Sequence, residues 1–305
     1  MNKQSLSLFY ICIIANTFLL SCVQKDTNNI VASDAKLELI SDQFSFTEGP
    51  AVDDEGNIYF TDQPNNNIWK YSIDGELTLF HQNCGRANGL YFDKNGQLLS
   101  CSDMHNELWS IDTKNGNNKV LVADFEGRKL NGPNDLWVTS QNEIYFTDPL
   151  YVRPYWERDT TSELNGEHVY FINKHGELLP VANDLVKPNG IIGTPDNKYL
   201  YVADIGDNKT YRYDILSNGE LTNKILFAPM GSDGMTIDSN GNIYLTGEGV
   251  TVYNNKGEQI ARIAVPEKWT ANVCIGGKRM NTLFITASKS LYAIQLNTQG
   301  AMSNN

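Results

Sequence analysis

Residues 132–149 read GPNDLWVTSQNEIYFTDP, in which Asn134 and Asp135 precede one apolar run and a polar turn leads to a second. Two apolar runs joined by a short polar turn are typical of a β-hairpin. The same arrangement, with an oxygen-bearing side chain directly before the first run, occurs six times. A strand-rich unit repeated about every 40 residues predicts the blades of a β-propeller. The six positions are Glu48, Asn88, Asn134, Asn189, Asp233 and Asn272, separated by 40, 46, 55, 44 and 39 residues.

The repeated units also share their later strands. Third and fourth apolar runs follow the hairpin in most units, and four strands make a propeller blade. The last unit is one strand short, whereas residues 36–41 (KLELIS) show the alternation of a strand before the first unit. We therefore predict an all-β fold, a six-bladed β-propeller with four-stranded blades in which the N-terminal strand closes the last blade.

The composition limits the function classes. The chain has 305 residues, of which 41 % are hydrophobic, and a formal net charge of -12. Such a chain can bury one large β core. This net negative charge would repel phosphate backbones, which disfavours nucleic-acid binding and favours binding of a cation. Cys101 and Cys274 lie within apolar strand patterns, which predicts buried side chains rather than disulfide partners.

The first residues have the pattern of an export signal. Lys3 precedes an apolar run from Leu8 to Leu20, which is short for a membrane span, and the run ends in LLSC at Cys22. Because this ending resembles a bacterial lipobox, we expect an exported lipoprotein monomer, facing the periplasm or the cell surface and held at the membrane only by a lipid on Cys22. The alternative is an ordinary secretion signal with an incidental Cys22. The predicted segments are a signal peptide over 1–21, a tether over 22–35, the propeller over 36–297 and a tail over 298–305.

The six repeated oxygen-bearing residues are expected to meet in space. The first strand of each propeller blade lines the central channel, so these side chains would form a ring around one mouth. Their two carboxylates and four amides suit one hard divalent cation, Ca²⁺ before Mg²⁺ or Mn²⁺, and disfavour Zn²⁺ without excluding it. For Asn88 and Asn272 the alternative is a plain turn role, because Asn is a common turn residue.

Several motifs in combination are typical of one family. They are GRANGLYFD (85–93), KLNGPNDLWV (129–138), IYFTDPLY (144–151), KPNGI (187–191), LYVADIGDNKTYRYD (200–214), SDGM (232–235) and NIYLTGEGVTVY (242–253). Over about residues 40–297 the chain resembles the senescence marker protein/gluconolactonase/luciferin-regenerating family, and within it the bacterial gluconolactonases. The resemblance implies a six-bladed propeller with one catalytic divalent cation.

The resemblance also implies roles for particular residues. Glu48, Asn189 and Asp233 match the family's cation ligands, and Asp233 matches its proposed general base as well. Asn134 matches an asparagine that contacts the substrate or the cation's water, so it is a candidate for both roles. Animal members have an arginine two residues before that asparagine, whereas this chain has Gly132. The sugar contacts of that branch therefore do not carry over.

The ring and the loops expected at the same mouth supply further candidates. Asn88 and Asn272 of the ring and His105 of a loop are candidate substrate contacts, and a solvated loop histidine is the alternative for His105. Residues 149–167 form an insertion whose aromatic and basic side chains, Tyr151 and Arg153 among them, would suit a lid over a polyhydroxylated ring. The alternative is a packing loop. Asp148 and Asp204, which end second strands, are either ligands or residues that fix a turn.

We therefore predict a cation-dependent carboxylic ester hydrolase that opens a small, sugar-derived lactone. One alternative is a phosphotriesterase or another ester hydrolase that uses the same site, because the organophosphate-hydrolysing propellers have a similar cation site. A second is a non-catalytic propeller that binds a sugar or a partner. A scaffold has no need for Glu48, Asn189 and Asp233 at equivalent channel positions, which favours the enzyme.

Overall fold

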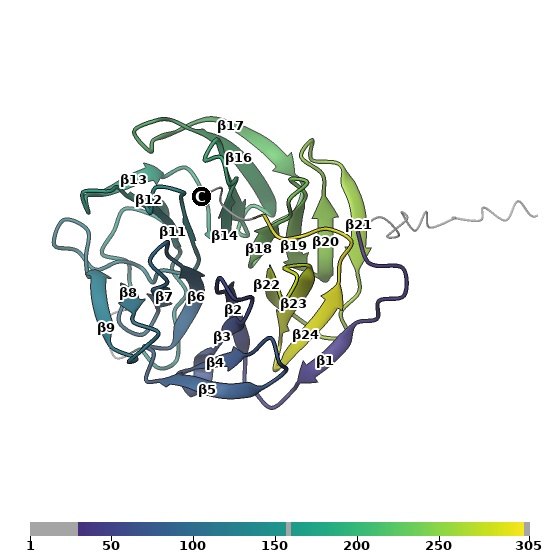
Figure 1. The fold of residues 1–305 in the computed structure, drawn as a ribbon. Helices are drawn as coiled ribbons and strands as arrows, with labels where there is room; N and C mark the ends of the chain where they lie inside the picture. The colour runs from purple at the N-terminus through teal and green to yellow at the C-terminus, as the bar shows by residue number, and fades with distance from the viewer. Residues whose placement is uncertain (1–29, 157–159, 302–305) are drawn as a thin grey trace, which may run out of the picture.

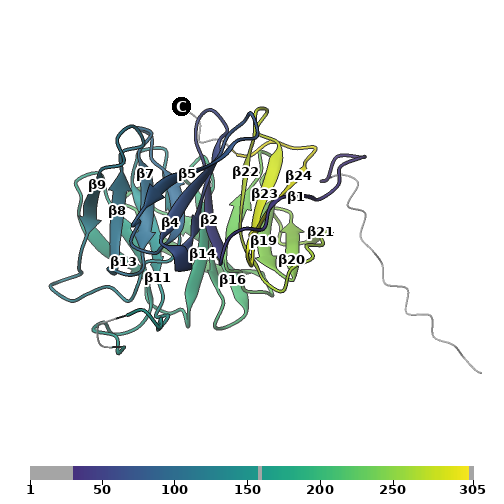
Figure 2. The ribbon, with the colours of Figure 1, turned by 90° about the horizontal axis from the view of Figure 1, so that it is seen from below.

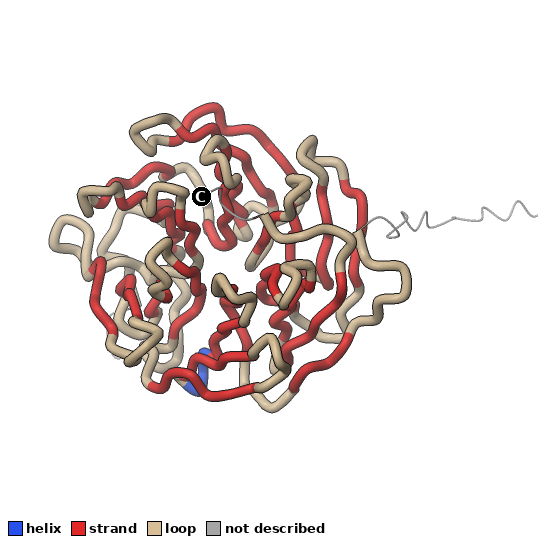
Figure 3. Tube along the Cα trace, viewed as in Figure 1, coloured by secondary structure: helices blue, strands red, loops and turns tan. Residues whose placement is uncertain are grey.

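Six four-stranded antiparallel sheets surround a central channel in the computed structural model, which describes residues 30–156 and 160–301 (Figure 1). The regular structure is almost entirely strand, as the red segments of Figure 3 show. One 3₁₀ helix, Gln63–Asn65, follows β3 (Ile58–Asp62). The all-β, six-bladed prediction is confirmed.

The first three blades follow chain order from the channel outward. Blade one contains β2 (Thr47–Val52), β3 (Ile58–Asp62), β4 (Asn67–Tyr71) and β5 (Leu77–Gln82). Blade two contains β6 (Ala87–Phe92), β7 (Leu98–Ser102), β8 (Glu107–Ile111) and β9 (Asn118–Val122). Blade three contains β10 (Leu136–Val138), β11 (Ile144–Asp148), β12 (His168–Ile172) and β13 (Leu178–Ala182).

The last three blades repeat this order until the chain closes on itself. Blade four contains β14 (Pro188–Gly193), β15 (Tyr199–Asp204), β16 (Lys209–Ile215) and β17 (Leu221–Ala228). Blade five contains β18 (Met235–Ile237), β19 (Ile243–Gly247), β20 (Gly249–Tyr253) and β21 (Gln259–Ile263). Blade six contains β22 (Thr270–Gly276), β23 (Thr282–Ala287), β24 (Ser290–Gln295) and β1 (Glu38–Ser41).

The N-terminal strand closes the ring, as predicted. β1 pairs antiparallel with β24, and Glu38 is opposite Ala293. Packing begins before the predicted propeller boundary, because Ile30 is buried in the core shared by blades five and six. At the other end the backbone N–H of Ala301 donates to the carbonyl of Ile237 (3.1 Å). The propeller thus makes contacts with residues of both predicted flanking segments.

The export signal and Cys22 lie outside the described residues, so both stay predictions. Within the described ranges, no helix is long and apolar enough to cross a membrane. Cys84, Cys101 and Cys274 are buried and free. This agrees with the prediction that Cys101 and Cys274 serve as small buried side chains.

Hydroxyl groups on the second strands fix the position of the next blade. The Oγ1 of Thr61 donates to the carbonyl of Asn88 (3.1 Å), and the Oγ1 of Thr147 donates to the carbonyl of Asn189 (2.8 Å). In the same way, the Oγ1 of Thr246 donates to the carbonyl of Ala271 (2.9 Å). Each buried bond joins the second strand of one blade to the first strand of the next blade, and so positions the ring side chains.

Aspartates that end second strands hold the loop before the first strand of their own blade. Asp148 accepts bonds from the backbone N–H groups of Asn131 (2.9 Å) and Gly132 (2.8 Å). Asp204 accepts from Val186 and Lys187, both at 2.8 Å. Of the two interpretations of Asp148 and Asp204, the turn-fixing role is therefore the one that the structure supports.

Candidate active site

The ring residues lie where the inner strands leave regular pairing. The register of β2 shifts after Glu48, and that of β14 shifts between Pro188 and Ile191, around Asn189. β-Bulges of this kind redirect a side chain out of the ordinary strand alternation. Asn134 and Asp233 stand two residues before the starts of β10 and β18. Asn88 and Asn272 lie inside β6 and β22, so the plain turn role for these two is wrong.

Four of the six ring residues line one cavity. Its volume is about 400 Å³, and Glu48, Asn88, Asn134 and Asp233 contribute to its wall. Asn189 is buried against it, because its Nδ2 donates to the Oδ1 of Asp233 (2.8 Å). The three predicted cation ligands and Asn134 therefore share one site.

The amide of Asn189 has one open position. Its Nδ2 is fully used, since it also donates to the hydroxyl oxygen of Tyr151 (2.9 Å). Its Oδ1 is buried and has no hydrogen-bond partner among the described residues. A buried acceptor without a partner is costly unless a ligand satisfies it. Next to Glu48 and Asp233 this oxygen completes an all-oxygen donor set, which fits a hard divalent cation.

The two carboxylates need a positive partner. Burial, and then the charge of Asp233, raise the pKa of Glu48 well above its ordinary value. Burial also raises the pKa of Asp233, whereas the hydrogen bonds from Trp269 and Asn189 lower it in part. Two buried like charges are unfavourable together unless a proton or a cation stands between them. Among the described residues, no cluster of three or more His, Cys, Asp or Glu could hold a metal, so amides must complete a cation site here.

Trp269 contacts the predicted general base and was missed from the sequence. Its indole Nε1 donates to the Oδ2 of Asp233 (2.6 Å), opposite the bond from Asn189 to Oδ1. Trp269 precedes β22 and also lines the cavity. The carboxylate of Asp233 is therefore held at both oxygens. No repeated motif contains Trp269, so the sequence pattern gave no signal for it.

The insertion after β11 brings Tyr151 and Arg153 into the cavity wall, where the lid prediction placed them. The Nε of Arg153 donates to Asp103 (3.0 Å), and the hydroxyl of Tyr155 donates to the same oxygen (2.6 Å). The later part of the insertion packs at Gly132. A Cβ there would lie 3.7 Å from the ring of Trp156 and 3.1 Å from the Oδ1 of Asp103.

Fold and site together can be compared with known proteins. The family model for the SMP-30/Gluconolactonase/LRE-like region matches residues 32–289. The chain belongs to this family. A gluconolactonase from Zymomonas mobilis is 26 % identical over 292 residues, which cover 87 % of this chain and 82 % of the relative.

Solved structures of other proteins share the fold. A gluconolactonase from Xanthomonas campestris is 26 % identical, with a TM-score of 0.82 over 90 % of this chain and 97 % of that one. The calcium-binding protein regucalcin from Agrobacterium tumefaciens is 20 % identical, with a TM-score of 0.73 over 88 % of this chain and 96 % of that one. The second likeness shows the fold alone.

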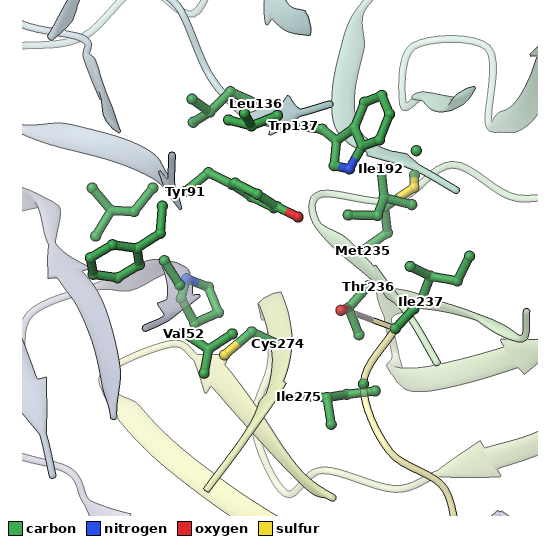
Figure 4. A pocket seen from close by; sticks show the side chains of 18 of the residues that line it. Val52, Tyr91, Leu136, Trp137, Ile192, Met235, Thr236, Ile237, Cys274 and Ile275 are labelled. Carbon is green, nitrogen blue, oxygen red and sulfur yellow. The ribbon is translucent and has the colours of Figure 1, made fainter. Parts of the chain in front are cut away.

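A second cavity lies at the opposite mouth of this SMP-30/gluconolactonase propeller (Figure 4). Its volume is about 450 Å³, and Asn272 lines it together with Asp135. The Nδ2 of Asn272 donates to the Oδ2 of Asp135 (3.4 Å), and burial raises the pKa of Asp135 to about 8. Figure 4 shows the hydroxyl of Tyr91 pointing into the space between the labelled side chains. Asn272, a candidate substrate contact, therefore lines the second cavity and not the one that contains Glu48.

The two mouths carry different segments of the chain. Figure 2 shows the loop after β11 at the lower face. Gly300 and Ala301 line the second cavity, whereas Tyr151 and Arg153 line the first. His105, the remaining candidate contact, is exposed and stacks on Trp109 at 5.3 Å between ring centroids. It lines neither cavity, and sequence alone could not distinguish this packing from substrate contact. Arg158, a further basic residue of the insertion, lies outside the described residues.

Proposed function

We propose that this family member is a divalent-cation-dependent hydrolase that opens a small, sugar-derived lactone. The observation that carries the proposal is the unpaired, buried Oδ1 of Asn189 beside the carboxylates of Glu48 and Asp233. The relatives from Z. mobilis and X. campestris, both named gluconolactonases, support the substrate class.

The ion would be held by Glu48, Asn189 and Asp233, with Asn134 as a fourth ligand or a contact to substrate. Oxygen ligands with two carboxylates favour Ca²⁺, with Mg²⁺ and Mn²⁺ as alternatives, whereas Zn²⁺ would ordinarily select His or Cys. When bound, such a cation supplies Lewis-acid polarisation of the lactone carbonyl. The calcium-binding regucalcin neighbour, which shares this fold, is consistent with Ca²⁺ as the first choice.

The residues of the chain supply the proton transfer and the orientation. Asp233 accepts the proton of the attacking water as general base, and Asn189 and Trp269 keep both of its oxygens in place. The amide of Asn134, which lines the same cavity, orients the water or the carbonyl. Tyr151 and Arg153 contact the remaining ring atoms and their hydroxyl groups.

Replacement of the general base tests this assignment. In Asp233→Asn we expect lactone turnover to fall by at least about 100-fold, the usual contribution of general-base catalysis, while the circular dichroism spectrum stays that of the native fold. Asp207→Asn is a matched control, because the carboxylate of Asp207 binds Lys209 and Tyr211 near the surface and does not line the cavity. Substantial lactonase activity in Asp233→Asn would show that another group takes the proton.

A substrate panel separates the alternatives. Lactones, phosphotriesters and simple esters should be assayed in the presence of Ca²⁺. We expect the largest kcat/KM for a lactone. Preferential turnover of a phosphotriester would instead support the organophosphate alternative, and no turnover of any compound would support a binding propeller.

A further inference from the structure

We propose that the lactone opened at this site carries an anionic substituent, a carboxylate or a comparable group, and that Arg153 and Lys187 bind it. The inference rests on the proposed lactonase function and narrows it to acidic lactones. Both side chains line the cavity that contains Glu48 and Asp233. Lys187 belongs to none of the roles assigned above, and its position before β14 was not singled out in the sequence.

One aromatic ring places both cationic groups beside the predicted cation ligands. The guanidinium carbon of Arg153 lies 5.0 Å from the centroid of the Tyr151 ring, and the Nζ of Lys187 lies 4.7 Å from it. The hydroxyl of the same tyrosine accepts a hydrogen bond from Asn189 (2.9 Å). Cation–π contacts of this kind hold a charged group in place without using its hydrogen-bond donors. The two positive groups are therefore fixed near the reacting centre.

Donors on both groups are left for a ligand. Arg153 uses its Nε for Asp103 (3.0 Å), and its two terminal nitrogens have no hydrogen-bond partner among the described residues. Lys187 donates to the carbonyl of Leu150 (3.0 Å) and pairs with Glu167 (3.7 Å), which leaves one of its three Nζ donors for a ligand. A guanidinium fork matches the two oxygens of a carboxylate, and an ammonium adds a point charge.

The charge balance favours an anion over a neutral sugar. A divalent cation would neutralise Glu48 and Asp233, so these carboxylates would no longer balance the positive side chains. The acids paired with those side chains are not among the residues that line the cavity. Asp103 is buried and also accepts from Tyr155 and Gln63, and Glu167 lies 3.7 Å from Lys187. The surface presented to a ligand is therefore positive at Arg153 and Lys187.

Two lactones with the same ring test the inference. D-glucaro-1,4-lactone has a carboxylate where D-glucono-1,4-lactone has a hydroxymethyl group. Charge-assisted hydrogen bonds should give the wild-type enzyme a kcat/KM at least about tenfold higher for the acidic lactone. The preference should weaken as salt increases, because screening acts on the charged substrate and not on the neutral one.

Variants assign the preference to the two cations. Arg153→Met and Lys187→Met should each lower the acidic-to-neutral ratio of kcat/KM by about tenfold, whereas Arg153→Lys should retain part of it because the charge remains. Lys70→Met is the matched control, because Lys70 also stands over a tyrosine ring, that of Tyr59 (5.2 Å), and lines neither cavity. The ratio should not change in the control.

The outcomes separate the two claims. An equal or higher kcat/KM for the neutral lactone, or a ratio that neither methionine variant changes, would overturn the anionic-substrate inference while leaving the lactonase intact. If neither lactone is hydrolysed, the proposed function fails on this pair. Calorimetric titration with the same two unreacted lactones then tests the anion preference alone, and tighter binding of the acidic lactone supports it, whereas equal binding overturns it.

Discussion

Asn189 shows at the scale of one residue how the site selects its ligand. Its nitrogen donates to Asp233 and Tyr151, which fixes the orientation of the amide and leaves Oδ1 as the only free acceptor. An amide oxygen fixed in this way is pre-organised for a cation, so binding requires little rearrangement. Burial makes the same oxygen costly to leave unsatisfied.

Removal of the indole donor tests the role of Trp269. In Trp269→Phe the ring remains but the bond to Asp233 is lost, and we expect kcat to fall by about tenfold, the value of one hydrogen bond to a charged group near solvent. Because this bond lowers the pKa of Asp233, its loss should also move the acid limb of the pH–rate profile to higher pH. An unchanged acid limb would mean that Trp269 only fills space.

Residue types at repeated positions could be predicted, whereas contacts between blades could not. Glu48, Asn134 and Asp233 were found from the sequence because each stands at the same point of a repeated unit. Trp269 and Lys187 lie in the loops before the first strands of their blades, at positions whose residue type is not repeated in the other blades. They reach the cavity only after the ring closes, which no local pattern records.

At the scale of the element, the inner strands must approach closely for the ring to form. Gly89 follows Asn88 in β6, and a Cβ there would lie 2.5 Å from the carbonyl oxygen of Asn134 and 2.7 Å from the Cα of Asp135. The Asn-Gly pair therefore reflects close packing between blades rather than a hairpin turn. Sequence alone could not separate these two uses, because the same dipeptide serves both.

A methyl group at Gly89 should therefore destabilise the propeller. We expect Gly89→Ala to lower the free energy of unfolding by about 2–3 kcal/mol, since the clash is with backbone atoms that cannot rotate away. Gly247→Ala is the control, because a Cβ at Gly247 would meet only the end of Met230 at 3.5 Å. Urea denaturation measures both. Equal stability of the two variants would contradict the close-approach argument.

At the scale of the whole molecule, the propeller has one cavity at each of the two mouths of its central channel. The repeated strands, and thus the fold, could be predicted because alternation and turn residues are local signals. How the six ring residues are distributed between the two cavities could not be predicted in this way. Asn272 has the same place in its unit as Glu48, but its Nδ2 bonds to Asp135 and it lines the far cavity.

The raised pKa of Glu48 should make the stability of the protein depend on pH, and should make the stabilisation by a cation larger at high pH. Because burial raises the pKa of Glu48 above its ordinary value of 4.5, its contribution to stability is present at low pH and is lost as pH rises through the raised pKa. In the metal-free protein Tm should therefore fall as pH rises. Added Ca²⁺ replaces the proton, so the increase in Tm that it causes should be larger at about pH 8 than at about pH 5.

Glu48→Gln provides the control for this pH effect, because the amide cannot titrate. In the variant, Tm of the metal-free protein should depend less on pH, and the Ca²⁺-induced increase should be smaller. Thermal denaturation with and without EDTA measures both quantities. A Ca²⁺-induced shift that is the same at every pH would mean that Glu48 does not exchange its proton for the ion.

The most direct test of the proposed mechanism is a Ca²⁺ titration of lactone hydrolysis after EDTA treatment. Metal-free protein should show no ring opening above the uncatalysed rate, and activity should return along a saturable curve as Ca²⁺ is added back. Glu48→Gln should need a higher Ca²⁺ concentration for half-maximal activity, because one carboxylate ligand is lost. Full activity in EDTA, with bound metal shown to be absent by elemental analysis, would contradict the account.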